Sequence, residues 1–186
     1  MARMVGISIF YSAASPSRAV TMINLSHISS RRPPFAYPGS QLRMNNIQLA
    51  DDNRSVLTQW LDSGACVVAC LCAAWCDTCG AFKHKFDDMA TLHPEERFVW
   101  IDIEDQAGLV GDLDIENFPT LLIQRNDVVA FFGTVLPDLW QTDRLLRAQL
   151  NKSAEELVRD ANSTVEKIDW QQRCNLRTRL QELPDD

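Results

Sequence analysis

The sequence of 186 residues lacks two features that membrane and nucleic-acid-binding proteins require. It contains no uninterrupted apolar run long enough to cross a bilayer, so we expect no transmembrane helix and no membrane partner. It also lacks an excess of basic residues, because its formal net charge is -7. Nucleic-acid binding needs cationic surface that neutralises phosphates, and we therefore expect no nucleic-acid partner. The hydrophobic content of 46% is sufficient for one domain with a core.

Acidic residues are absent from residues 1–44, which carry five arginines and many serines. This segment therefore has a charge of +5, and the remainder of the chain has -12. No helical or strand periodicity persists in it, so we expect a basic, disordered leader. There are two alternatives: residues 1–44 are a targeting segment, or the start was assigned too early and Met44 is the true beginning. We expect a cytoplasmic protein, or an organellar or exported one if residues 1–44 are a targeting segment.

From residue 45 onward the hydrophobic pattern predicts an α/β domain over residues 45–150. The expected elements form a mixed sheet with helices on both faces. In chain order they are an edge strand at 46–50, a helix at 55–61 capped by 51–53, a buried strand at 65–73, a helix from 76 to about 90, a strand at 97–103, a short helix at 105–111, a hairpin of strands at 120–124 and 128–132 ended by Gly133, and a helix at 138–150. Residues 151–186 are polar, with apolar residues at loosely helical spacing. They predict a C-terminal extension of one or two helices that lies on the domain or frays.

Cysteine is concentrated rather than scarce, and five of the six fall within fourteen residues. The six are Cys66, Cys70, Cys72, Cys76, Cys79 and Cys174. A disulfide scaffold spreads its cysteines to connect distant loops, so this clustering favours redox chemistry, metal binding or a buried strand that uses cysteine as a small apolar residue. Cys66, Cys70 and Cys72 alternate along one strand and therefore share a face, as small core residues would.

Cys76 and Cys79 are separated by two residues and stand at the expected start of a helix. Free backbone N–H groups and the helix dipole stabilise a thiolate at that position. We therefore expect Cys76 to be the nucleophile that attacks a substrate disulfide. Cys79, about one turn later and more buried, would resolve the mixed disulfide.

Three motifs together resemble the thioredoxin superfamily. Trp75-Cys76-Asp77-Thr78-Cys79 is similar to the family's Trp-Cys-Gly-Pro-Cys active site, Phe118-Pro119-Thr120 to its cis-proline motif, and Phe132-Gly133 to the pair that closes its substrate groove. The resemblance covers about residues 45–150. It implies a thioredoxin fold and a protein-disulfide reductase whose redox disulfide joins Cys76 and Cys79. It also implies a substrate groove formed by Trp75, Phe118, Pro119, Phe132 and Gly133, with a cis bond before Pro119, which faces Cys76.

The sequence also departs from the family's pattern. Cys70 and Trp100 stand where thioredoxins place a buried aspartate and its lysine partner, so the proton acceptor for the second cysteine is missing and its attack should be slower. Asp77-Thr78 replaces Gly-Pro between the cysteines. The negative charge of Asp77 disfavours a thiolate at Cys76. The Asp77 carboxylate is itself stabilised by the helix dipole.

A metal or iron–sulfur site using Cys72, Cys76 and Cys79 is disfavoured, because these three do not converge easily from a strand end and a helix start and no histidine is in register. His84 and His93 are expected to be surface residues. We therefore expect no metal and no cofactor.

The resemblance implies a monomer whose partners are proteins with disulfides and a thioredoxin reductase or another thiol donor. The alternative function is a peptide-binding or adaptor module with little redox activity. It is motivated by the missing buried acid and by the added C-terminal helices.

Overall fold

The computed structural model describes residues 44–113 and 115–183, so the predicted leader lies outside the described residues except for Met44. The elements, in order, are β1 (Asn46–Gln48), the 3-10 helix η1 (Asp51–Asn53), α1 (Arg54–Asp62), β2 (Cys66–Cys72), α2 (Asp77–Leu92), β3 (Arg97–Asp102), α3 (Ala107–Val110), β4 (Thr120–Arg125), β5 (Val128–Thr134), α4 (Leu139–Leu150), α5 (Ala154–Ala161), α6 (Val165–Arg173) and α7 (Leu176–Gln181). The order predicted for the domain is confirmed, and each of its predicted elements is present.

Five strands form one mixed sheet in the order β1-β3-β2-β4-β5. β1 and β2 run parallel to β3, whereas β4 runs antiparallel to both β2 and β5. β2 lies in the centre, and its continuous apolar run is explained by helices on both sides of it. β1 is the edge strand that its length suggested.

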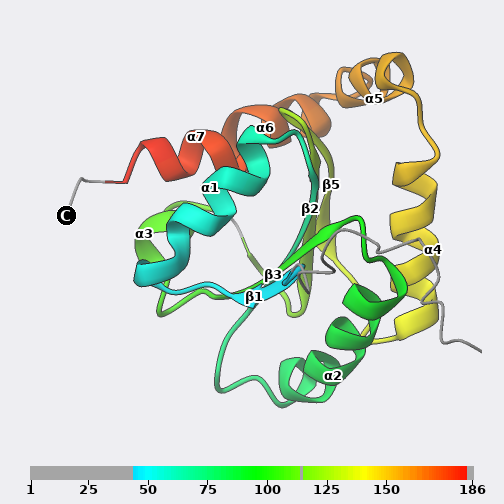
Figure 1. Ribbon diagram of the computed structural model, residues 1–186. Coiled ribbons are helices and arrows are strands. Elements are labelled where there is room, and N and C mark those ends of the chain that lie inside the picture. The colour runs from blue at the N-terminus through cyan, green and yellow to red at the C-terminus, as the bar shows by residue number, and fades with distance from the viewer. Residues whose placement is uncertain (1–43, 114, 184–186) are drawn as a thin grey trace, which may run out of the picture. The chain divides into compact units, whose positions relative to one another are not determined.

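Alternate residues of the strands contribute to two separate cores, one on each face of the sheet. Figure 1 shows the helices that cover the two faces. On one face, Cys70 and Cys72 of β2 pack with α2 and α4. On the other face, Val67, Ala69 and Leu71 pack with α1, α3 and α7. The side chains of β2 thus point alternately toward the two helical layers, and its cysteines all face α2.

Within residues 151–183, the C-terminal extension forms three helices, one more than the largest number predicted. The N-cap residues of the three helices are Ser153, Thr164 and Asn175, and the side chain of each accepts a hydrogen bond from a backbone N–H in the first turn of its helix. Gln124, fully buried in β4, anchors the last helix: its Oε1 accepts from the Leu176 backbone N at 2.8 Å, and its Nε2 donates to Asn175 Oδ1 at 3.1 Å. The extension is therefore part of the packed structure, while the boundary at residue 150 stays a prediction.

The prediction that Gly133 ends the last strand is wrong, because β5 continues through it to Thr134. Gly133 pairs with Leu121 of β4, and its φ of 157° is a positive value that glycine adopts more readily than other residues. Glycine here weakens a strand without ending it, since the neighbouring register holds it in place.

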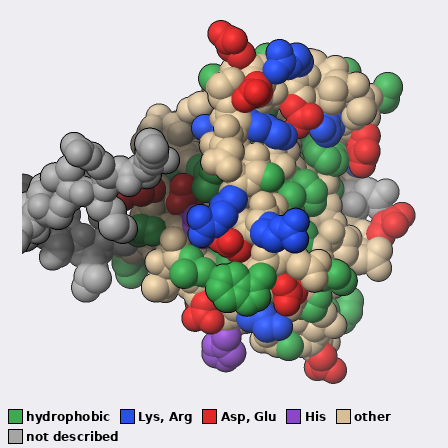
Figure 2. Space-filling view, turned by 90° about the vertical axis from the view of Figure 1, so that its right-hand side faces the viewer, with side chains coloured by type: hydrophobic (Ala, Val, Ile, Leu, Met, Phe, Trp, Pro, Cys, Tyr) green, Lys and Arg blue, Asp and Glu red, His purple; other side chains and the backbone are tan. Residues whose placement is uncertain are grey.

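The face seen in Figure 2 carries acidic and basic side chains intermixed, with separate hydrophobic groups between them. Among residues 44–113 and 115–183, no helix combines the length and the apolar character that crossing a bilayer demands.

His93 was predicted to lie on the surface, but it is only 6% exposed. It ends α2, and its Nε2 lies 2.6 Å from Oδ1 of Asp143 on α4. The other carboxylate oxygen of Asp143 accepts a hydrogen bond from Arg147 Nε at 2.8 Å. This buried contact ties the end of α2 to α4, and the sequence pattern missed it because the two residues are fifty positions apart. His84 is exposed, as predicted.

Asp143 should make the stability of the fold depend on acidic pH. The bond from Arg147 and, after it, the contact with His93 hold the pKa of Asp143 below its ordinary value of 3.8. Its stabilising contribution is therefore present above about pH 4 and is lost as the pH falls through the lower folded-state pKa. Asp143→Asn should lower the free energy of unfolding at pH 7 by about 1–3 kcal/mol, measured by urea titration.

The matched control is Asp169→Asn, which removes an exposed partner of Arg173 and should cost less than about 0.5 kcal/mol. The gap between wild type and Asp143→Asn should shrink as the pH drops from about 4 toward 2. A gap of constant size across that range would contradict the role given to Asp143.

Candidate redox site

Cys76 is the N-cap residue of α2, which confirms the position predicted for it. Its backbone is extended (φ -85°, ψ 104°), and its Sγ accepts a hydrogen bond from the Cys79 backbone N at 3.4 Å. The chain reaches this position through a tight turn in which Cys76 N donates to the Ala73 carbonyl at 3.0 Å. The thiol thus receives an N–H group that the first helical turn would otherwise leave without a partner.

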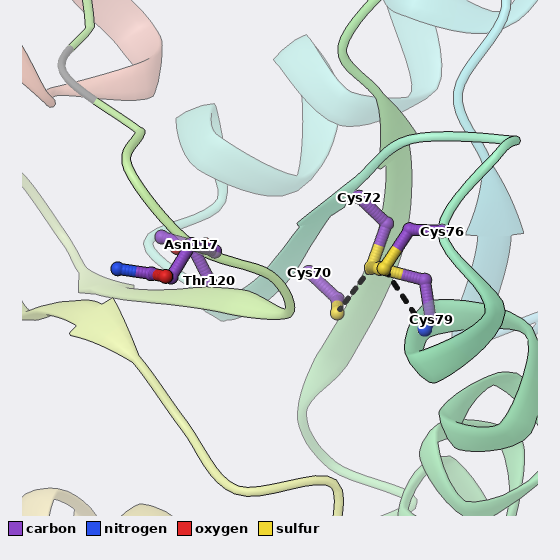
Figure 3. Close-up of a disulfide and its surroundings, with 6 residues drawn as sticks. All are labelled: Cys70, Cys72, Cys76, Cys79, Asn117 and Thr120. Carbon is purple, nitrogen blue, oxygen red and sulfur yellow. Dashed lines mark hydrogen bonds between the residues drawn. A yellow bond between two sulfur atoms is a disulfide. The ribbon is translucent and has the colours of Figure 1, made fainter.

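The structure differs from the predicted disulfide. Cys79 is bonded to Cys72, and Cys76 is a free, partly exposed thiol. Figure 3 shows that these three cysteines meet where β2 ends and α2 begins. Cys72 and Cys79 have their Cα atoms 5.9 Å apart, which is within the ordinary range for a disulfide.

The expectation that Cys72, Cys76 and Cys79 do not converge easily is wrong for Cys72 and Cys79, whose sulfurs are bonded. Cys72 is the last residue of β2 and points toward α2, and Cys79 lies on the buried side of the first turn of that helix. The signal was present in the sequence, because the alternation of Cys70 and Cys72 assigns them to one face. What the sequence did not show is that the turn after β2 brings α2 back over that same face.

Cys70 lies behind the disulfide, with its Sγ 3.7 Å from that of Cys72. A disulfide sulfur has no hydrogen, so Cys70 is the donor in this contact. Burial raises the pKa of Cys70, since the thiol is enclosed by apolar side chains. Cys70 is also the register partner of Trp100 on β3, the two positions where a proton-handling pair was expected. A buried thiol that holds its proton is a poor proton acceptor for Cys79.

Trp75 connects the helix start to the proline loop. It is 66% exposed, and its ring meets Phe118 edge-on at a centroid distance of 5.7 Å. Phe118 and Cys76 pack against the same core cluster. The peptide bond between Phe118 and Pro119 is cis, as predicted, and Thr120 Oγ1 donates to the Asn117 carbonyl at 2.7 Å within this loop. That Pro119 faces Cys76 stays a prediction.

Phe132 and Gly133 are placed differently from the other predicted groove residues. They line a cavity of about 340 Å³ together with Trp170 and Arg173 of α6. The Phe132 side chain belongs to the core on the α1 and α7 side of the sheet, opposite the face that holds Cys72 and Cys79. Their role in substrate binding stays a prediction.

In the described parts of the chain, no group of three or more metal-ligating side chains is suitably placed to hold a metal ion. The carboxylate of Asp102 instead accepts backbone N–H bonds from Glu104 at 2.9 Å and Asp105 at 3.4 Å. Asp102 is the last residue of β3, and its carboxylate therefore caps the turn that follows the strand.

The family model named Thioredoxin matches residues 48–134, a little under half of the chain. A thioredoxin-like protein CXXS1 from Oryza sativa subsp. japonica is 34% identical over 83 residues, which are 44% of this chain and 62% of that protein. A putative thioredoxin H10 from Arabidopsis thaliana is 24% identical over 88 residues, 47% of this chain and 57% of that protein. The chain thus spans about 60% of the length of these relatives.

Among solved structures, a wild-type thioredoxin h from poplar has the same fold, with a TM-score of 0.52 and 19% identity over 59% of this chain and 99% of that one. Three features define the class of protein: a five-stranded mixed sheet, a cysteine at the N-cap of α2, and a loop with a cis-proline. The chain carries a domain of the thioredoxin superfamily, with the thioredoxin fold.

The remaining cysteines should be unreactive. Burial raises the pKa of Cys66 to about 12, with Glu96 adding to the effect, and burial also raises the pKa of Cys174 to about 12. At pH 8 only about one molecule in ten thousand would then carry a thiolate at either site. In the reduced native protein, iodoacetamide should therefore modify Cys76 at least about a hundredfold faster than Cys66 or Cys174, as followed by mass spectrometry.

The rate at Cys66 and Cys174 should rise about tenfold for each unit of pH, because thiolate is scarce until the pH approaches the raised pKa. Labelling of Cys174 as fast as that of Cys76 at pH 8 would contradict this assignment.

Proposed function

We propose that this protein is a thiol–disulfide oxidoreductase that reduces disulfides in other proteins through Cys76 and Cys79. The observation that carries the proposal is Cys76 itself: a partly exposed free thiol that caps α2 and accepts the Cys79 N–H. A helix N-terminus favours the thiolate form, and the thiolate is the attacking species.

The reaction begins from the dithiol form, in which Cys79 is reduced. The Cys76 thiolate attacks one sulfur of a substrate disulfide, so a mixed disulfide forms and one substrate thiolate leaves. Cys79 then attacks Cys76 Sγ and releases the second substrate thiolate. A thioredoxin reductase or another thiol donor returns the protein to its dithiol form.

The surface around Cys76 supports binding of an extended peptide. Trp75 presents a largely exposed ring beside the nucleophile, and Phe118 supports it from the proline loop. An exposed aromatic ring next to a reactive thiol offers apolar contact area to a substrate without covering the sulfur. We place substrate contacts at Trp75, Phe118 and Pro119, with Phe132 and Gly133 as more distant candidates.

The resolving step should be slow compared with that of a site that has a buried carboxylate. Cys79 is only 2% exposed, and the position behind it holds the protonated thiol of Cys70. Removal of the Cys79 proton must then rely on water or on the departing thiolate. Mixed disulfides on Cys76 are accordingly expected to persist long enough to be detected.

A peptide-binding adaptor is the second candidate. The observation in its favour is that the disulfide with Cys72 occupies Cys79, which leaves Cys76 without a resolving thiol. A double variant, Cys76→Ser with Cys79→Ser, that retained every captured partner would support the adaptor. Partners captured as mixed disulfides by Cys79→Ser alone would support the reductase.

Reduction of insulin disulfides, followed by turbidity with dithiothreitol or a thioredoxin reductase as donor, tests the proposal. Cys76→Ser should abolish the catalysed rate, because no other cysteine combines exposure with a helix N-terminus. Cys174→Ser, a buried cysteine distant from the site in sequence, is the matched control and should retain about the full rate. A wild-type rate no higher than that of Cys76→Ser would rule the reductase out.

We further propose a reducing compartment such as the cytoplasm, and a monomer that works on protein substrates. A reducing environment maintains the dithiol form that the first step needs.

A further inference from the structure

The junction of β2 and α2 holds three cysteines, one more than a dithiol reductase needs. We propose that Cys72 is a third redox-active residue, which exchanges with Cys76 as the disulfide partner of Cys79. The proposal rests on the proposed function, because Cys76 and Cys79 are the pair that meets the substrate.

Cys79 is within reach of both partners. Its Sγ is bonded to Cys72, and its backbone N donates to Cys76 Sγ at 3.4 Å. Figure 3 shows the Cys72 side chain coming from the strand, and those of Cys76 and Cys79 from the start of the helix. Cys79 thus contacts a strand cysteine through its sulfur and the helix-cap cysteine through its backbone N–H.

Burial separates the roles of the two partners. Cys72 and Cys79 are 1% and 2% exposed, whereas Cys76 is partly exposed. An external thiol or disulfide therefore meets Cys76 first, and the bond between Cys72 and Cys79 is shielded. Electrons enter or leave the buried pair by way of Cys76.

The exchange balances without an external oxidant. After substrate reduction, the protein holds a disulfide between Cys76 and Cys79 and a thiol at Cys72. The Cys72 thiolate attacks Cys79 Sγ, the bond to Cys76 breaks, and Cys76 leaves as a thiolate. The proton lost by Cys72 ends on Cys76 or in solvent. Over the whole cycle, Cys72 and Cys79 are oxidised and one substrate disulfide is reduced to two thiols.

The surroundings favour the isomer in which Cys76 is free. Released Cys76 thiolate accepts the Cys79 N–H at the helix N-terminus and is open to water, whereas a Cys72 thiolate would be enclosed in an apolar cluster. The disulfide therefore moves inward once a substrate has been released. The protein is left with a single reactive thiol at the surface.

Cys70 has a supporting part in the reverse step. When Cys76 reopens the buried disulfide, Cys72 is the leaving sulfur, and the S–H of Cys70 at 3.7 Å donates to it. A hydrogen bond to a departing thiolate stabilises it. Cys70 forms no disulfide, and Cys70→Ser keeps a hydrogen-bond donor beside Cys72, so this variant is the matched control for Cys72→Ser.

Chymotryptic mapping of the oxidised protein separates the two isomers, because cleavage after Trp75 divides Cys72 from Cys76. Free thiols are alkylated under an acid quench before digestion. We expect two peptides joined through Cys72 and Cys79, with Cys76 alkylated, in wild type and in Cys70→Ser. In Cys72→Ser we expect the bond within one peptide, between Cys76 and Cys79. A wild-type map with Cys72 alkylated and Cys76 bonded to Cys79 would overturn the proposal.

A second measurement tests whether the buried disulfide opens through Cys76. Dithiothreitol should reduce it at least about tenfold faster in wild type than in Cys76→Ser, in which the shielded bond must be attacked directly. Equal rates would mean that the bond is inert and would also overturn the proposal.

The insulin assay separates this failure from failure of the proposed function. If insulin reduction depends on Cys76 but the map shows no bond to Cys72, the reductase function is supported and the redox role of Cys72 is rejected. If the bond to Cys72 opens only through Cys76 but insulin is not reduced, the disulfide exchange is supported and the reductase function is rejected.

Discussion

The turn between β2 and α2 determines most of what this protein can do. A backbone hydrogen bond from Cys76 N to the Ala73 carbonyl closes this turn, and α2 begins at the next residue, Asp77. The helix then returns over the face of the sheet that carries Cys70 and Cys72 and packs Cys79 against it. Because side chains alternate along a strand, a shift of β2 by one residue would point Cys72 to the opposite face and separate it from Cys79.

The same turn places Cys76 at a helix cap, apart from the cysteines that lie within β2. Cys76 stays at the surface because a helix cap lies at the end of the packed region. Cys66 and Cys70 are held in the strand, where burial raises their pKa and keeps them protonated. The position of each cysteine along β2 and the first turn of α2 therefore determines its reactivity. Trp75 and Phe118 form an aromatic contact next to Cys76.

Much of this arrangement could be predicted from the sequence. The continuous apolar run before Cys76 and the strand-like stretches after it led to the correct order of elements, and the cis bond before Pro119 followed from the family resemblance. The bond between Cys72 and Cys79 could not be predicted, because it depends on where a helix lands after a turn. The burial of His93 beside Asp143 was missed for the same reason: periodicity describes the faces of single elements and carries no information about contacts between distant ones. Gly133 was misread because glycine weakens a strand without ending it when neighbouring strands hold the register.

The most direct test of the central claim is the reduction potential of the three-cysteine centre, obtained by equilibrating the protein with thiol–disulfide buffers of known potential. A reductase must retain its dithiol form under cellular conditions, so the account predicts a value near about -270 mV. A value near about -120 mV would describe a centre that oxidises its partners and would contradict the account.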